Sequence, residues 1–180
     1  MEYFDLLTSE GHPTGEVKER ALVHRDGDWH QTVHIWVVNE RSEILLQLRS
    51  PNKDSRPNMW DVSVGGHIAA GDTPALAAQR ELKEELGLSA SGDDLEYLFL
   101  VRVEADPETP DFVDNEFNEV YLFRTSSDQV LHLQGDEVAD AKYFTLSEFQ
   151  KLVLEHPEEI VDRAEEYARF IEIFSQRIVG

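Results

Sequence analysis

The stretch that decides the fold runs from Gly66 to Leu88 and reads GHIAAGDTPALAAQRELKEELGL. A glycine-rich turn leads into a helical segment that carries Glu81, Glu84 and Glu85. With about 100° of rotation per residue, these carboxylates share one side of the helix. Clustered carboxylates repel one another, and a hard divalent cation with oxygen ligands relieves that repulsion. The segment therefore predicts one half of a magnesium or manganese site.

The ends of this helix are also specified by the sequence. Thr73 is a suitable N-cap, and Pro74 suits the first helical position, where the N–H that proline lacks has no partner. Gly87 is placed to end the helix in the left-handed conformation. An ordinary solvated helix face is the alternative explanation for the acidic side. The preceding glycine turn favours metal binding.

The same stretch resembles the Nudix box, whose consensus is glycine, five residues, glutamate, seven residues, and then Arg-Glu-aliphatic-any-Glu-Glu-any-Gly-aliphatic. The positions that match are Gly66, Arg80, Glu81, Leu82, Glu84, Glu85, Gly87 and Leu88. The one departure is Asp72, which keeps the charge of the consensus glutamate on a shorter side chain. The resemblance implies the Nudix fold, a mixed α/β (α+β) architecture in which a mixed β-sheet is sandwiched between helices.

The resemblance also implies roles for the residues of the box. In the family, the last glutamates bind divalent cations, and the first glutamate of the Arg-Glu pair orients or deprotonates water. By position, Glu84 and Glu85 are the implied ligands of Mg²⁺ or Mn²⁺, and Glu81 is the assisting carboxylate. The carbonyl of Gly66 is a further implied ligand. Arg80 is expected to hold the carboxylates in register, so the implied catalytic group is Arg80, Glu81 and Glu84.

Family members usually add an acidic residue from outside the box. The segment DNEFNEVYLF offers Asp114, Glu116 and Glu119. Glu119 lies within an apolar strand pattern, where an unpaired carboxylate is costly to bury. We therefore expect Glu119 to be the outside ligand, with Glu116 as the second choice. An exposed position at the edge of the site is the alternative for either residue, and above all for Asp114.

A small basic group precedes the box. The segment LRSPNKDSRPNMW carries Arg49, Lys53 and Arg56, in a chain that has only 16 lysines and arginines. These side chains are candidates for binding the phosphate oxygens of a substrate, which a negatively charged protein otherwise repels. A merely soluble loop is the alternative explanation.

Composition bounds the class of protein. At 180 residues the chain is long enough for one domain with a buried core. A net charge of −21 argues against nucleic-acid binding, because the phosphate backbone is repelled. The sequence has no apolar run of membrane-spanning length and no signal-peptide pattern, so we expect no membrane association. The absence of cysteine is consistent with a cytoplasmic location.

The hydrophobic pattern predicts alternating strands and helices within a single Nudix domain over residues 1–180. Extended segments are expected at 3–7, 15–23, 33–38, 44–49, 60–64, 95–104, 117–124 and 141–144. Thr145 and Glu148 form a capping-box pattern for a short helix. An N-terminal β extension (about 1–29) and a C-terminal helix (about 157–179) flank the central part, and either could mediate a homodimer.

Two further segments, ALVHRDGDWHQTVHIWVVN and SPNKDSRPNMWDVSVGGH, resemble the type I isopentenyl diphosphate isomerases, a branch of the same fold. Those enzymes hold a metal with histidines, and His24, His30 and His67 stand at matching places. The isomerases also need a cysteine near the glycine pair, where this chain has Gly65. The first glutamate of their Glu-Asn-Glu motif is replaced by Phe117, while Asn118 and Glu119 remain. Surface positions for His24 and His30 are the alternative, and His67 has the best claim to a metal.

Together, these resemblances imply a Nudix hydrolase. It is expected to cleave the pyrophosphate bond of a small diphosphate-linked substrate, of the nucleoside diphosphate or NDP-X type, by divalent-metal-assisted attack of water. An isopentenyl-diphosphate isomerase-like enzyme and a non-catalytic nucleotide-sensing module are the two alternatives.

Overall fold

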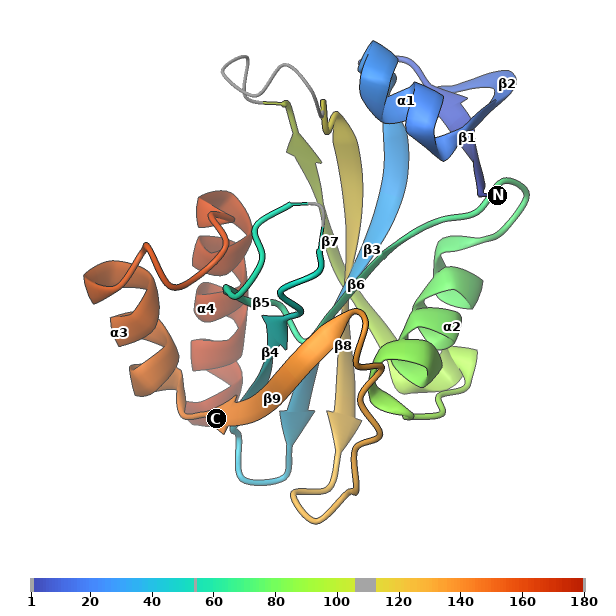
Figure 1. Cartoon of the computed structure of the whole chain (residues 1–180). Helices are drawn as coiled ribbons and strands as arrows, with labels where there is room; N and C mark the ends of the chain where they lie inside the picture. The colour runs from blue at the N-terminus through green and yellow to red at the C-terminus, as the bar shows by residue number, and fades with distance from the viewer. Residues whose placement is uncertain (1, 54, 106–112, 180) are drawn as a thin grey trace.

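The computed structural model describes residues 2–53, 55–105 and 113–179. A seven-stranded mixed sheet forms its centre, in the order β5-β4-β3-β8-β7, with β6 pairing with β3 and β9 with β4 (Figure 1). Its strands are β3 (His30–Asn39), β4 (Ile44–Arg49), β5 (Trp60–Asp61), β6 (Val64–His67), β7 (Leu95–Val103), β8 (Glu116–Thr125) and β9 (Val138–Phe144). β3 and β8 are parallel, whereas their other neighbours are antiparallel.

Helices cover both faces of this sheet. α2 (Pro74–Leu86) lies on one face, and α3 (Leu146–Glu155) and α4 (Ala164–Val179) lie on the other (Figure 1). Side chains alternate along β3, so Val33 and Ile35 pack against α2, while Trp36 packs against α3 and α4. This arrangement confirms the expected mixed sheet between helices.

Both ends of α2 lie where the sequence predicts them. The Thr73 hydroxyl caps the helix by accepting a hydrogen bond from Leu76 N at 3.3 Å, and Pro74 occupies the first turn. Gly87 ends the helix in the left-handed conformation with a φ of 70°. Thr145 and Glu148 likewise form the predicted capping box at the start of α3.

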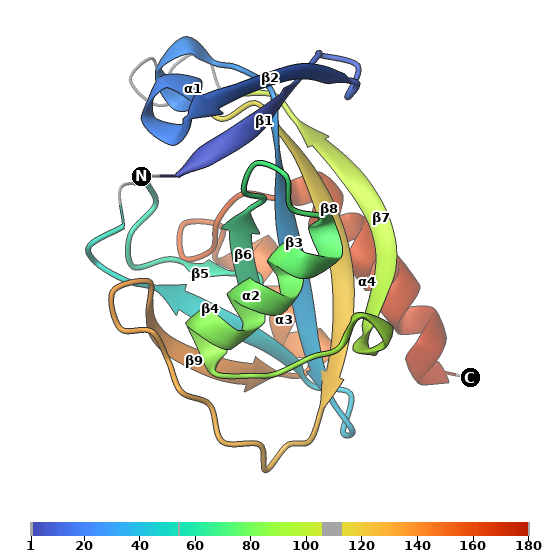
Figure 2. The same cartoon turned by 90° about the vertical axis from the view of Figure 1, so that its right-hand side faces the viewer.

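The N-terminal extension contains a helix as well as a hairpin. β1 (Tyr3–Leu7) and β2 (Pro13–Glu19) pair in a separate two-stranded sheet, and α1 (Arg20–Asp26) follows directly. The prediction of an extended segment over 15–23 is therefore wrong for its last residues. These residues turn into a helix that buries Val23 and His24. Figure 2 shows this unit above the N-terminal end of β3.

Two other boundaries differ from the prediction. The segment expected as one strand over 60–64 divides into β5 and β6, which pair with β4 and β3 respectively. The C-terminal helix begins at Ala164 and not at Pro157, because residues 157–159 form a turn and Ile160 bridges to Trp60. Within the described residues, no helix has the length and apolar character that crossing a bilayer requires.

Candidate active site

Glu81 lies directly over Gly66 on the α2 face of the sheet. A Cβ atom at position 66 would stand only 2.2 Å from the carboxyl carbon of Glu81. Glycine is therefore required at this position by the close approach of β6 to α2 and not by its backbone angles. The glycine of the box and its first glutamate form one packed unit.

Arg80 ties this unit together. Its Nη1 atom lies 2.6 Å from Glu81 Oε1 and 3.5 Å from Glu84 Oε2. Its Nη2 atom donates a hydrogen bond of 2.9 Å to the carbonyl oxygen of His67 on β6. The guanidinium thus joins the helix to the strand and sets the positions of two acidic side chains.

The acidic residues of α2 differ in their burial. Glu85 is 4% exposed and accepts a hydrogen bond of 3.1 Å from Gln47 Nε2, whereas the side chain of Glu84 is 53% exposed. Burial raises the pKa of Glu81 to about 7 despite the opposing charge of Arg80. Burial, together with the charge of Glu81, raises the pKa of Glu85 to about 8. Oxygen donors that repel one another in this way fit a hard divalent cation such as Mg²⁺ or Mn²⁺.

The structure adds Glu137, an acidic residue outside the box that the sequence analysis missed. Backbone hydrogen bonds from Gln134 N to Glu85 O (3.1 Å) and from His132 N to Leu86 O (2.9 Å) fix the segment before β9 to the end of α2. The charge of Glu137 contributes to the raised pKa of Glu85. Nothing local in the sequence distinguishes Glu137 from the many other acidic residues, because its position depends on this long-range docking.

The predicted outside ligand, Glu119, occupies a different part of the same face. Val33 pairs with both Gly66 and Glu119, so Glu119 lies two strands from Gly66, on the side that Glu81 occupies. Its carboxylate accepts a 3.5 Å hydrogen bond from Gln31 Nε2, and burial raises its pKa. Glu116 is on the opposite face, since side chains alternate along β8.

That opposite face holds a cluster of histidines. One ligand atom from each of His24, His30, His67 and Asp114 lies within 4.8 Å of the others. Glu116 Oε1 stands 3.7 Å from the Nε2 atoms of both His30 and His67. His24 and His30 are buried, so the alternative of surface positions is wrong. The acids beside the histidines are Asp114 and Glu116, three residues before the Phe117–Glu119 triplet aligned from sequence.

The chemistry of this cluster fits a transition metal. Burial lowers the pKa of His30 to about 4 and the pKa of His67 well below its ordinary value, so both imidazoles are neutral at physiological pH. Among the described residues, the buried Nε2 atoms of His30 and His67 have no hydrogen-bond partner. Neutral imidazoles with one or two carboxylates are ligands for zinc, manganese or iron. Gly66 and His67 are adjacent on β6, so they face opposite sides of the sheet. The acidic group of α2 and the histidine cluster are therefore two candidate metal sites on opposite faces of the same strand.

The three basic residues at the end of β4 and in the β4–β5 loop do not converge. Arg49 directs its guanidinium to Asp61 and to the loop backbone. Arg56 Nη1 lies 3.5 Å from the carbonyl oxygen of Asp162. Only Lys53 faces the acidic end of α2, where it forms an ion pair with Glu137 and opposes the raised pKa of Glu85.

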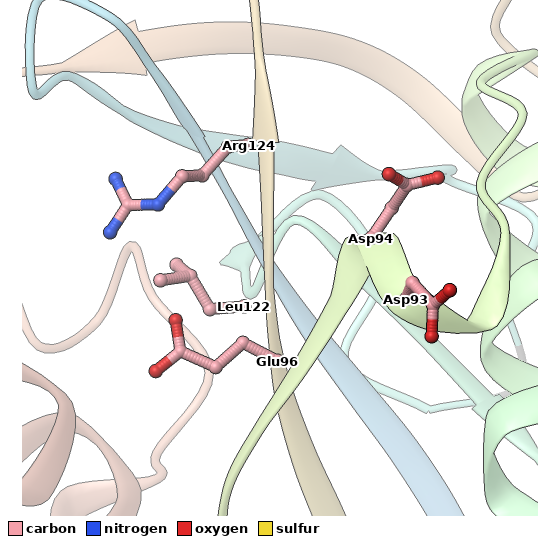
Figure 3. A pocket seen from close by; sticks show the side chains of 5 residues that line it. All are labelled: Asp93, Asp94, Glu96, Leu122 and Arg124. Atoms are coloured by element: carbon pink, nitrogen blue, oxygen red, sulfur yellow. The ribbon is translucent and has the colours of Figure 1, made fainter.

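A separate pocket of about 280 Å³ holds none of the predicted site residues. It is lined by Asp93 and Asp94 of η1 (Gly92–Asp94) and by Glu96, Leu122 and Arg124 (Figure 3). Glu96 already forms an ion pair of 2.6 Å with Arg177. The candidate active site is therefore the acidic helix with its flanking loops.

A mixed sheet between helices, with an acidic loop–helix–loop docked on it, defines the Nudix class of domain. The NUDIX domain pattern matches residues 28–164, and the chain belongs to the Nudix family. Nudix hydrolase 3 from Arabidopsis thaliana is 42% identical over 187 residues, which cover 98% of this chain and 24% of that protein. The chain thus spans about a quarter of the length of that relative.

Two further similarities concern the isomerase branch and the fold. An isopentenyl-diphosphate Delta-isomerase from Pectobacterium atrosepticum is 28% identical over 154 residues, covering 86% of this chain and 82% of that protein. The crystal structure of DR0079 from Deinococcus radiodurans matches with a TM-score of 0.69 at 22% identity, covering 97% of this chain and 98% of that one. The expected fold and the likeness to the isomerase branch are confirmed.

Proposed function

We propose that this chain hydrolyses the pyrophosphate bond of a small diphosphate-linked substrate, of the nucleoside diphosphate or NDP-X type. The observation that carries the proposal is the packed unit of Gly66, Arg80 and Glu81 with the buried Glu85 beside it. Mg²⁺ or Mn²⁺, when bound, supplies charge neutralisation and a water of lowered pKa. Such an arrangement suits displacement at phosphorus without a covalent intermediate.

The residues of the site divide the work. Glu84, Glu85 and the carbonyl of Gly66 would hold the cations, and either Glu137 or Glu119 would add the carboxylate from outside the box. Glu81 accepts the proton of the attacking water, since a pKa of about 7 suits a general base at neutral pH. Lys53 contacts the phosphate oxygens.

The histidine cluster is the structural observation that favours the isomerase alternative, since it matches the metal-binding histidines of that branch. Two features argue against the isomerase. The chain has no cysteine, and the residue at position 65, beside His34, is a glycine. Without a thiol there, the proton donor that the isomerases need is missing, which leaves hydrolysis as the better supported reaction.

A substrate panel tests the proposal. Products from nucleoside diphosphates, NDP-sugars, ADP-ribose and isopentenyl diphosphate are separated by chromatography after incubation with Mg²⁺, for the wild type and for Glu84→Gln. Cleavage of a pyrophosphate bond that is lost in Glu84→Gln is the expected result. Rearrangement of isopentenyl diphosphate without cleavage would establish the isomerase, and binding without turnover would establish the sensor.

A metal at the histidine cluster should also stabilise the fold, because its ligands come from α1, β3, β6 and the segment before β8. We expect a chelator to lower the melting temperature by about 5 °C or more, since a ligand bound only by the native state stabilises it. His67→Asn should abolish this response to the chelator, whereas Glu84→Gln should retain it. An unchanged melting temperature in the wild type would contradict metal binding at the cluster.

A further inference from the structure

Asp61 is a buried carboxylate that joins two distant arginines. It is 1% exposed, and its Oδ2 atom lies 3.1 Å from Nη1 of Arg49 at the end of β4. Arg163, just before α4, approaches the same carboxylate through Nε at 2.7 Å and Nη2 at 3.1 Å. Burial alone would raise the pKa of Asp61, but the guanidiniums outweigh it and hold that pKa well below its usual range. Asp61 is therefore a permanent negative charge inside the domain.

The other hydrogen-bond donors of Arg49 bind the β4–β5 loop, which the structure describes at residues 50–53 and 55–59. Its Nη2 atom donates to the carbonyl oxygen of Ser55 at 2.9 Å, and its Nε atom donates to that of Arg56 at 3.1 Å. The side chain of Arg49 is only 14% exposed. A planar guanidinium committed in this way acts on the loop and leaves little surface for a ligand.

The loop needs such support. Arg56 and Asn58 both adopt left-handed backbone angles, with φ values of 48° and 59°. Non-glycine residues persist in this conformation only where surrounding contacts fix them. Backbone hydrogen bonds between Asn58 N and Arg49 O (3.2 Å) and between Arg49 N and Met59 O (3.0 Å) hold the C-terminal side of the loop, and those from Ser50 N to Glu137 O (2.9 Å) and from Lys53 N to Ser50 O (3.2 Å) hold its start. The side chain of Arg49 binds the middle of the loop, at Ser55 and Arg56.

We propose that Asp61 and Arg49 form a positioning pair that holds the β4–β5 loop over the acidic end of α2, so that Lys53 is presented to the diphosphate. In this arrangement Arg49 binds the loop and does not contact the substrate. Arg163 fixes Asp61 from the other side, which anchors the loop to the segment before α4. The inference rests on the proposed function for its substrate, but its structural half can be measured without any substrate.

The test compares Arg49→Lys, Asp61→Asn and the double variant. Arg49→Lys keeps the charge beside Asp61 but loses the fork that reaches Ser55 and Arg56. We expect each single variant to raise the KM for the diphosphate about 10-fold, with kcat within about twofold of the wild type. The double variant should have a KM no higher than that of the more strongly affected single variant, because both changes break the same chain of contacts. Amide hydrogen exchange over residues 50–53 and 55–58 should increase in all three. Arg41→Lys, an exposed change between β3 and β4, is the matched control.

Other outcomes would overturn the proposal. If Arg49 contacted the phosphate directly, Asp61→Asn would leave the KM unchanged or lower it. The KM of the double variant would then differ from the KM that either single variant predicts for one broken contact chain. Unchanged exchange over residues 50–53 and 55–58 in Arg49→Lys would refute the positioning role even if Asp61→Asn failed to fold. If exchange increases as expected but no diphosphate is cleaved by the wild type, the proposed function fails, and the claim that the pair presents Lys53 to a diphosphate fails with it.

Discussion

Glu85→Gln is expected to lower kcat at least ~10²-fold, because an amide oxygen is a far weaker ligand for a hard dication than a carboxylate. The substitution removes a charge from a side chain that is 4% exposed and leaves its shape almost unchanged. Turnover with saturating Mg²⁺, on the substrate found in the panel, measures the effect. Glu172→Gln, an exposed change on α4, is the matched control and should retain normal turnover.

The same variant should keep its fold, which separates a catalytic effect from a structural one. In the metal-free protein, burial and the charge of Glu81 raise the pKa of Glu85 to about 8, so this carboxyl is mostly protonated at pH 7. Glutamine resembles that neutral form, and Gln47 can still hydrogen-bond to it. We expect a metal-free melting temperature equal to or above that of the wild type. Normal turnover in a folded Glu85→Gln protein would remove Glu85 from the site.

Local sequence patterns were sufficient to predict the ends of an element where that element carries its own capping residues. The helix from Pro74 to Leu86 was predictable at both ends because Thr73 and Gly87 adopt the cap geometries that their residue types favour. The start of the C-terminal helix was predicted too early in the chain. Ile160 continues the helical period of apolar residues, but in the structure it forms an isolated β-bridge with Trp60. Tertiary contacts decide such residues, and periodicity does not reveal them.

The candidate site was predictable within the box and much less so outside it. Glu137 reaches Glu85 only because the segment before β9 docks on the end of α2, a contact between residues about 50 positions apart that no spacing rule anticipates. The acids near the histidines were assigned three residues too late along the chain. In a strand, an odd shift moves a side chain to the other face, which is why Glu119 and Glu116 lie on opposite sides of β8.

The affinity of the protein for Mg²⁺ is expected to rise roughly 10²-fold or more between pH 6 and pH 9. The pKa of Glu81 is raised to about 7 and that of Glu85 to about 8, so both carboxyls are mostly protonated at pH 6. Magnesium must displace the proton of its ligand Glu85, and each pH unit below the pKa of that group weakens binding about tenfold. Isothermal titration at several pH values measures the affinity and the protons released. Magnesium is the suitable ion because imidazole ligands bind it poorly.

Stability should change with pH in the opposite direction. A carboxyl whose pKa in the folded protein lies above its ordinary value of 4.5 stabilises the fold at low pH, and this contribution is lost as the pH rises through the folded pKa. The metal-free melting temperature should therefore fall between about pH 5 and pH 8, and saturating Mg²⁺ should reduce the fall, because the cation favours the ionised carboxylates. Glu85→Gln should flatten the metal-free curve, since one of the carboxyls with a raised pKa is gone. A magnesium affinity that stays constant from pH 6 to pH 9 would contradict the assignment of Glu85 to the cation site.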